Sequence, residues 1–237
     1  MLSTMLDYLP TLLRGALVAL EITAGAAAIG LVMAVLAGLM ARARQRAVRA
    51  IARVYVEFFR GTSALVQLFW LFFALPLLGW EMHPMFAGIV ALGLNIGAYG
   101  AEVVRGAVNA VSPGQYEAAI ALSFSPAQRM RRIIFPQAVV GMIPPFGNLL
   151  IELLKGTALV SLITINDLTF NAQVLRQLTG HTVLIFSMVL VLYFVMAYLM
   201  TLGMRWLERR AKASIGQVPV ATTQPAVKTV VRKEVPA

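Results

Sequence analysis

The chain has 237 residues, of which 59% are hydrophobic and only 13% are charged. An ordinary soluble domain is roughly half apolar and about a quarter charged, so this chain has too little polar surface to coat a soluble globule and is predicted to lie in a membrane. Its net charge of +10 does not indicate a nucleic-acid binder, because the basic residues flank apolar segments, and the absence of cysteine excludes disulfides and thiolate sites.

Five segments without Asp, Glu, Lys or Arg are close to the length of about 20 residues that crosses a bilayer. These segments are residues 22–41, 61–80, 82–101, 133–151 and 177–204. Pro136, Pro144 and Pro145 disturb the start of the fourth segment, and its apolar run continues to Ile165, so we place that span late. We therefore predict an all-α integral membrane protein, with its membrane domain at residues 1–212 and spans near 15–41, 56–80, 84–105, 142–165 and 182–206.

The basic residues indicate the orientation of these spans. Sixteen of the 20 lysines and arginines lie in two alternate loops and in the C-terminal tail, at 42–53, 105–132 and 205–233. Short cytoplasmic loops carry an excess of such residues, so we predict an outside N-terminus and a cytoplasmic C-terminus. The tail at 213–237 is rich in Pro, Val, Thr and Lys without an apolar helical face, which predicts disorder.

The loop at 106–136 reads as two short helices between apolar spans. Ser112-Pro113 and Ser125-Pro126 each have the pattern of a helix start, and Tyr116, Ile120 and Phe124 recur at four-residue steps. The residues alone leave two interpretations open, namely a helix that rests on the lipid surface and a docking helix for a soluble subunit.

Three acid–base pairs have the i, i+3 spacing at which side chains share a helix face: Glu57/Arg60, Glu102/Arg105 and Glu152/Lys155. Mutual neutralisation, which eases the insertion of charges into a membrane, is the plain interpretation of the first two pairs; gating and structural pairing are the alternatives. Gly93, Gly97 and Ala101 form a small-residue face that predicts close helix packing.

The fourth span carries a polar stripe formed by Asn148, Glu152 and Lys155, with Thr157 and Ser161 further along. Ionisable groups inside a membrane usually face a bundle interior or a cavity, and a zwitterionic substrate needs both an acidic and a basic contact. We interpret the stripe as a candidate substrate pathway. The pathway candidates on the second and third spans are Arg60, Thr62, Asn95, Tyr99 and Glu102.

The run Glu117-Ala118-Ala119, three residues, Ser123, nine residues, and Ile133 to Pro136 resembles the cytoplasmic EAA loop of ABC transporter permeases. That motif has glycine where this chain has Ser123 and leucine where it has Phe135. Other segments resemble the polar amino-acid permease subfamily, so the resemblance covers roughly residues 10–210. These segments are Phe59–Thr62 with Gln67, Tyr99–Glu102, Arg105-Gly106, Ser112–Gln115, Pro144–Asn148 and Leu154–Leu159.

The resemblance implies a type I ABC importer permease of the bacterial inner membrane, with a periplasmic N-terminus. It implies an identical or homologous second permease subunit, a cytoplasmic ATPase dimer and an extracytoplasmic solute-binding protein. The residues that would couple to the ATPase are Glu117, Ala118, Ala119, Ser123 and Pro136. The sequence lacks a P-loop motif, so ATP and magnesium are expected on the partner chain and no cofactor on this one.

The implied function is transport rather than enzymatic catalysis, and the implied substrate is a polar amino acid or a derivative. Compatible solutes of the ectoine type are one candidate, and basic or acidic amino acids and opines are others. Two alternatives remain. The first is an ion-driven secondary transporter of small zwitterions, which five spans without a repeat fit poorly. The second is a non-transporting membrane scaffold.

Overall fold

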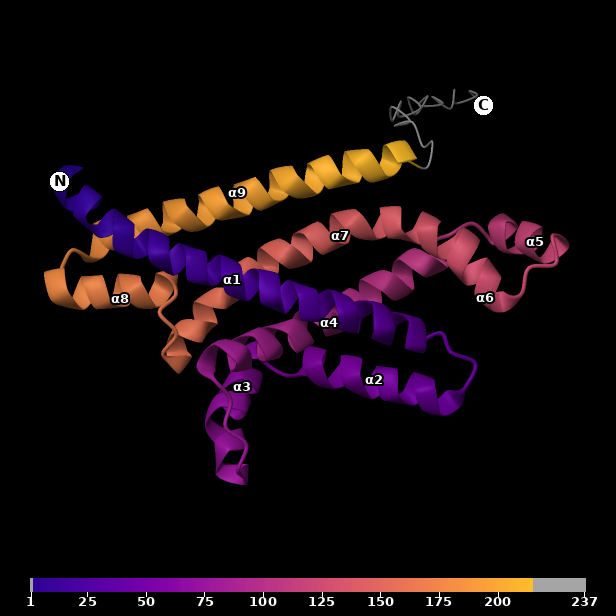
Figure 1. The fold of residues 1–237 in the computed structure, drawn as a ribbon, viewed down its shortest axis with the longest axis horizontal. Helices are drawn as coiled ribbons and strands as arrows, with labels where there is room; N and C mark the ends of the chain where they lie inside the picture. The colour runs from indigo at the N-terminus through magenta and orange to yellow at the C-terminus, as the bar shows by residue number, and fades with distance from the viewer. Residues whose placement is uncertain (1, 215–237) are drawn as a thin grey trace, which may run out of the picture.

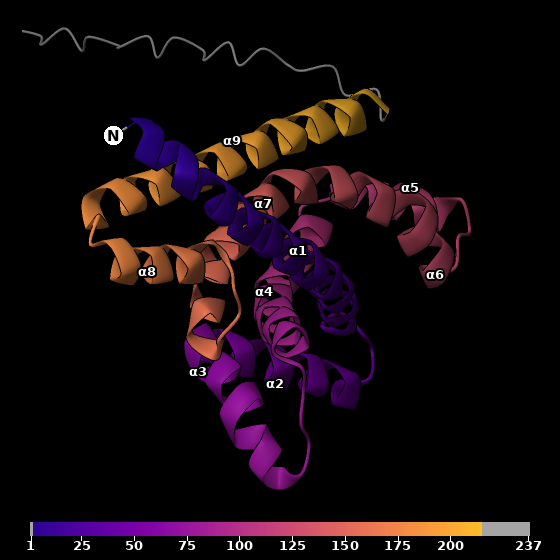
Figure 2. The same ribbon diagram turned by 60° about the vertical axis from the view of Figure 1, so that its left-hand side comes forward.

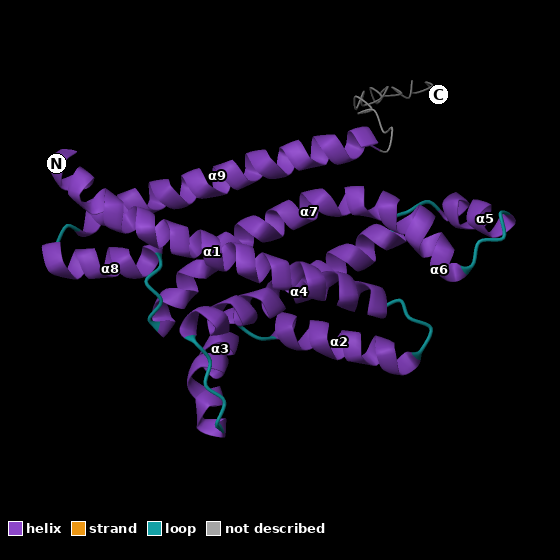
Figure 3. Cartoon of the chain, viewed as in Figure 1, coloured by secondary structure: helices purple, strands orange, loops and turns teal. Residues whose placement is uncertain are grey.

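The computed structural model describes residues 2–214, and that range contains helices and loops but no strand (Figure 3). Beyond residue 214, the tail predicted to be disordered lies outside the described residues. Five long or medium helices and four shorter ones follow one another, with π and 3-10 turns between them. The helices are α1 (Leu2–Met40), α2 (Arg46–Gly61), α3 (Ala64–Phe69), α4 (Pro84–Asn109), α5 (Pro113–Ala121), α6 (Pro126–Arg129), α7 (Phe135–Gly156), α8 (Leu168–Thr179) and α9 (Thr182–Ser214).

Four helical runs are long and apolar enough to cross a membrane by length and composition. They are Leu6–Met40, Pro84–Asn109, Pro126–Ile163 and Thr182–Ala213. A fifth candidate is the pair Arg46–Gly61 and Ala64–Leu78, which is bent by 102° at its break. The second predicted span therefore does not run straight through 56–80, and α3 projects away from the other helices (Figure 2).

The bend between α2 and α3 is stabilised by two amide side chains. Gln67 Nε2 donates to the Phe59 carbonyl at 2.9 Å and to Thr62 Oγ1 at 2.6 Å. Asn95 of α4 donates to the same carbonyl at 3.0 Å and to Gln67 Oε1 at 3.1 Å. A broken helix frees backbone groups that lipid cannot satisfy, so these amides supply the missing partners.

Helices α1 and α4 cross at the centre of the molecule, with their backbones in close approach (Figure 1). A Cβ atom at Gly97 would come within 2.9 Å of Met33 Cβ and 3.1 Å of the Gly30 carbonyl oxygen. One at Gly93 would lie 3.0 Å from the Ala26 carbonyl oxygen. The small-residue face predicted from the sequence therefore serves packing.

The fourth span starts earlier than predicted. A continuous helical run begins at Pro126, passes through a π-helical turn, η3 (Met130–Ile134), and enters α7, which contains Pro144 and Pro145. The placement near 142–165 assumed that the prolines would delay the helix. They are tolerated because each removes only one hydrogen bond, and the carbonyls that they free belong to Val140 and Gly141, which border a cavity.

A buried carboxylate fixes the entry into α8. The span that contains α7 ends in a 3-10 turn, η4 (Thr157–Ile163), and Asp167 in the following loop accepts a hydrogen bond from the Phe170 N–H at 2.9 Å. Burial raises the pKa of the Asp167 carboxyl to about 6. The same loop packs on α1, where a Cβ atom at Gly15 would come within 2.7 Å of the Asp167 carbonyl oxygen.

We expect Gly97→Ala to lower the melting temperature of the purified protein, because the added methyl group meets backbone and Met33 at distances that force the two helices apart. Overpacking of this kind costs about 1–3 kcal/mol. Gly106→Ala on the same helix is the matched control, since nothing lies within 4 Å of a Cβ atom there. It should be neutral or slightly stabilising through helix propensity. Equal melting temperatures for the two variants would contradict the packing role.

Candidate functional site

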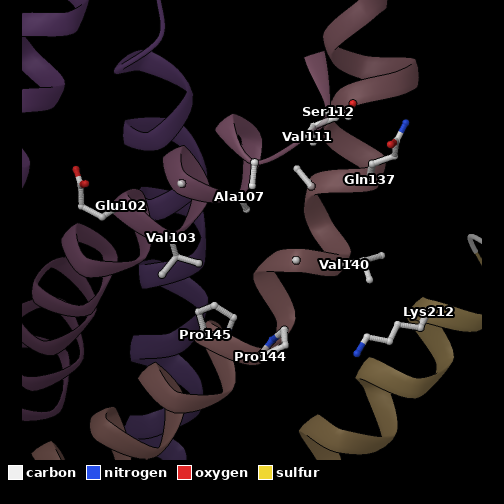
Figure 4. Close-up of a pocket in the computed structure, with 14 residues that line it drawn as sticks. Glu102, Val103, Ala107, Val111, Ser112, Gln137, Val140, Pro144, Pro145 and Lys212 are labelled. Carbon is white, nitrogen blue, oxygen red and sulfur yellow. The ribbon is translucent and has the colours of Figure 1, made fainter. Parts of the chain in front are cut away.

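One face of α7 combines a cavity with a polar stripe. Gln137, Gly141 and Pro145 border a cavity of about 720 Å³ between α4, α7 and the end of α9. Figure 4 shows Glu102 on α4 and Lys212 on α9 at opposite sides of this cavity, with α7 between them. The same face continues through Asn148, Glu152 and Lys155, because steps of three and four residues return to one side of a helix.

The stripe of Asn148, Glu152 and Lys155 is exposed on the surface of this chain. Among the described residues no ion pair within 4.0 Å joins Glu152 to Lys155, although their spacing would allow one. Charges near the centre of a membrane helix cost roughly 2.5–3.5 kcal/mol each. This face of α7 therefore needs water, a ligand or another chain against it.

Thr157 and Ser161 do not join the stripe. Both side chains are buried, and their hydroxyls donate to carbonyls within their own turn, those of Leu154 and Ala158, at 2.7 Å. The exposed stripe therefore does not include them. At about 100° per residue, positions 157 and 161 lie roughly half a turn away from Asn148 even on a regular α-helix, on the face opposite to Glu152.

The other charged candidates lie around a second cavity of about 380 Å³ between α2 and α4. Glu102 forms the predicted ion pair with Arg105 and lines both cavities. Glu57 lies 4.0 Å from Arg53 rather than pairing with Arg60, whose guanidinium lies over the Tyr99 ring at 5.3 Å from its centroid. Arg60, Tyr99 and Glu102 are thus brought together, whereas Thr62 and Asn95 hold the bend between α2 and α3.

Helix α5 has one anchored face and one free face. Ala119 is fully buried, whereas Glu117 and Ala118 are exposed, and Ile120 and Leu122 are 57% and 68% exposed. Apolar side chains left open in this way suit contact with another protein. Pro136, the last of the predicted coupling residues, lies apart from this face, exposed at the start of α7.

Ser123 closes α5 in the left-handed conformation, with φ of +58°. The Ser123 N–H donates to the Ile120 carbonyl at 2.8 Å, and the Phe124 N–H donates to the Ala119 carbonyl at 3.0 Å. This pair of bonds is the Schellman motif, which usually has glycine at the left-handed position. The turn is therefore the one that a glycine would form, and the serine adopts it at a cost in strain.

The sequence did not reveal side chains whose hydrogen-bond partners lie far away along the chain. Gln67 belongs to a recognised motif, yet its role at the bend depends on Asn95, 28 residues away. Gln137 donates to Gln115 of α5 at 3.2 Å, and Arg42 contacts Tyr116. Periodicity within one segment carries no signal for such contacts.

Comparison with known proteins connects this arrangement to transport. A family model described as "Binding-protein-dependent transport system inner membrane component" matches residues 26–213. A probable amino-acid ABC transporter permease protein of Sinorhizobium fredii is 48% identical over 208 residues, which cover 85% of this chain and 87% of the relative. The glutamine transport system permease protein of Escherichia coli is 35% identical over 206 residues, covering 86% and 94% of the two chains.

A solved structure has the same fold. It is described as an amino acid ABC transporter with histidines, and it matches with a TM-score of 0.82 at 35% sequence identity. The match covers 87% of this chain and 97% of that chain, so the likeness extends over nearly all of the membrane domain.

Replacement of Ser123 by glycine should stabilise the turn after α5. Release of a serine from the left-handed region recovers about 1 kcal/mol, because glycine adopts φ of +58° without a Cβ clash. We expect slower hydrogen exchange of the amides of residues 119–124. Ala121→Gly is the control, since it removes helix propensity without relieving any positive φ, and it should speed exchange. Faster exchange in Ser123→Gly would show that the serine is not strained.

Proposed function

The chain belongs to the family of binding-protein-dependent transport system inner membrane components, and we propose that its α7 face forms one wall of the substrate pathway. It is a multi-pass inner-membrane permease subunit of an amino-acid ABC importer, a transport component rather than an enzyme. The exposed charges of Glu152 and Lys155 carry the proposal, because a monomer would leave them against lipid.

A second permease subunit, identical or homologous, would cover the α7 face. Two such faces enclose a space between them in which Asn148, Glu152 and Lys155 meet water instead of hydrocarbon. The cavity at Gln137 and Pro145 would then be the continuation of that space toward α5. An extracytoplasmic solute-binding protein would deliver substrate to the opposite end.

The chemistry of the stripe suits a small zwitterion. The Glu152 carboxylate can accept hydrogen bonds from an ammonium group, and the Lys155 ammonium can pair with a carboxylate, while Asn148 adds one donor and one acceptor. Every α-amino acid carries both charged groups at close spacing. Ectoine-type solutes are also zwitterions and remain a candidate, although the relatives quoted above are named for amino acids or for glutamine.

The free face of α5 would dock on a cytoplasmic ATPase dimer that binds ATP and magnesium. Ile120 and Leu122 supply apolar contact area and Glu117 supplies charge, all on the side turned away from the membrane helices. With α5 docked on the ATPase, α5 and the C-terminus would be cytoplasmic and the N-terminus periplasmic, which is the orientation that the distribution of basic residues predicts.

We expect Glu152→Ala to reduce uptake to background in proteoliposomes that contain the assembled importer. Labelled L-glutamine, L-histidine, L-arginine, L-glutamate and ectoine are the probes, and co-purification with the ATPase should be unchanged. Glu81→Ala, which removes an exposed acid from the loop before α4, is the control and should transport normally. Normal uptake by Glu152→Ala would exclude the stripe from the pathway. In cells, loss of uptake with an uncoupler at constant ATP would instead favour the secondary transporter.

Reversal of charge by Glu117→Lys should uncouple ATP hydrolysis from uptake without affecting membrane insertion, because Glu117 lies on the free face of α5. The measurement is substrate transported per ATP hydrolysed in the same proteoliposomes. Glu81→Lys, at an exposed position in the loop before α4, controls for the charge change. Normal coupling in Glu117→Lys would return α5 to the lipid-surface interpretation.

A further inference from the structure

We propose that Arg42 is a positioning residue that fastens α5 to the membrane helices through Asn109 and Tyr116. This inference rests on the proposed role of α5 as the coupling element. The guanidinium of Arg42 donates to Asn109 Oδ1 at the end of α4 and, at 3.2 Å, to the Tyr116 hydroxyl of α5. One side chain thus joins the loop after α1 to both segments. We call these three residues the Arg42 latch.

The base of the latch is fixed to α1. The Arg42 backbone N–H donates to the Leu39 carbonyl at 3.0 Å, and the Ala41 N–H donates to the Ala37 carbonyl at 2.9 Å, so the last turn of α1 holds the residue in place. Because α1 is packed against α4 through glycines, Arg42 extends from a closely packed pair of helices.

The other end of the latch is held in the hydrophobic core. The Tyr116 ring packs against a cluster that contains Val104, Val108 and Ile134, while its hydroxyl also donates to the Val108 carbonyl at 3.4 Å. A charge-assisted hydrogen bond from Arg42 therefore acts on a side chain that is already partly immobilised. Tyr116 orients α5 through its ring and its hydroxyl together.

The latch and one further bond tie α5 to three long helices. Gln137 near the start of α7 donates to Gln115 of α5 at 3.2 Å. The backbone joins α5 to α4 only through residues 110–112, and a helix of nine residues does not hold its own orientation. Without Arg42, α5 can pivot about this linker, so displacement imposed on its free face is lost before it reaches the spans.

Arg42 differs in this respect from its neighbours in the same basic loop. Arg44 also contributes a positive charge, yet its guanidinium makes none of the hydrogen bonds described for residues 6–214, and only its carbonyl is used, by Arg49. If Arg42 served membrane topology alone, the loss of either arginine would have the same effect. The pair Arg42 and Arg44 therefore separates positioning from the general charge of the loop.

The first test is hydrogen exchange of the permease in lipid nanodiscs. In Arg42→Ala and Tyr116→Phe we expect the amides of residues 114–121 to exchange about three- to tenfold faster, because both variants release the same bond. The two changes together should add little to either one alone. Arg44→Ala should match the wild type. Unchanged exchange in Arg42→Ala, or an equal rise in Arg44→Ala, would overturn the proposal.

The second test is coupling in proteoliposomes with the partner ATPase and binding protein, using whichever of the five labelled solutes is transported. Arg42→Ala and Tyr116→Phe should lower substrate transported per ATP at least threefold, while ATPase binding stays normal because Arg42 is not on the free face of α5. Arg42→Lys should recover part of the loss, since one ammonium can still reach one acceptor. Faster exchange with an unchanged transport ratio would make Arg42 merely structural. Failure of the docking role itself would instead appear as normal coupling in Glu117→Lys.

Discussion

The close approach of the α1 and α4 backbones is the constraint on which the rest of the molecule depends. Lipid provides no hydrophobic drive for helix association, so contact between Gly30, Gly93 and Gly97 must come from van der Waals packing at short range. Helices α7, α8 and α9 pack on this pair through apolar clusters, whereas α2, α3 and α5 are also held by polar contacts. Tyr55 of α2 donates to the Leu94 carbonyl at 2.7 Å, Asn95 holds the bend before α3, and Arg42 holds α5.

The membrane also divides the polar groups of the spans into two sets. Some form hydrogen bonds within the chain, and others are left exposed for water, a substrate or another chain. Gln67, Asn95 and the hydroxyl of Thr157 are satisfied within the chain, and each holds a break or a change of helix type. Glu152 and Lys155 are left exposed and unpaired with each other. The contrast separates structural polar residues from transport candidates more sharply than burial or position along the span does.

The sequence predicted the apolar spans, the two helix starts at Ser112 and Ser125, and the small-residue face, because these follow from composition and local periodicity. It could not predict the bend at Thr62, since the aromatic run after it reads as one continuous span and the amide that holds the bend comes from α4. It also named Thr157 and Ser161 as hydroxyls further along the pathway, although a period of 3.6 residues already puts both about half a turn away from the stripe. The prolines misled because the tolerance of Pro144 depends on the cavity beside it, which the sequence does not show.

Helix α5 is connected to the stripe through one turn and one continuous helical run. The Schellman turn at Ser123 leads directly into a capping box, in which Ser125 and Gln128 satisfy each other's backbone groups, and from Pro126 the helical run continues to Ile163. Glu152 therefore lies on the same continuous helical run that begins two residues after the last bond of the turn. The two backbone hydrogen bonds of the turn, from Ser123 to Ile120 and from Phe124 to Ala119, hold the angle of this joint. Arg42 and Gln137 hold α5 on its other side. A displacement of its free face can therefore be transmitted to the membrane helices in two ways, through α1 and α4, and along α7 to the charged stripe.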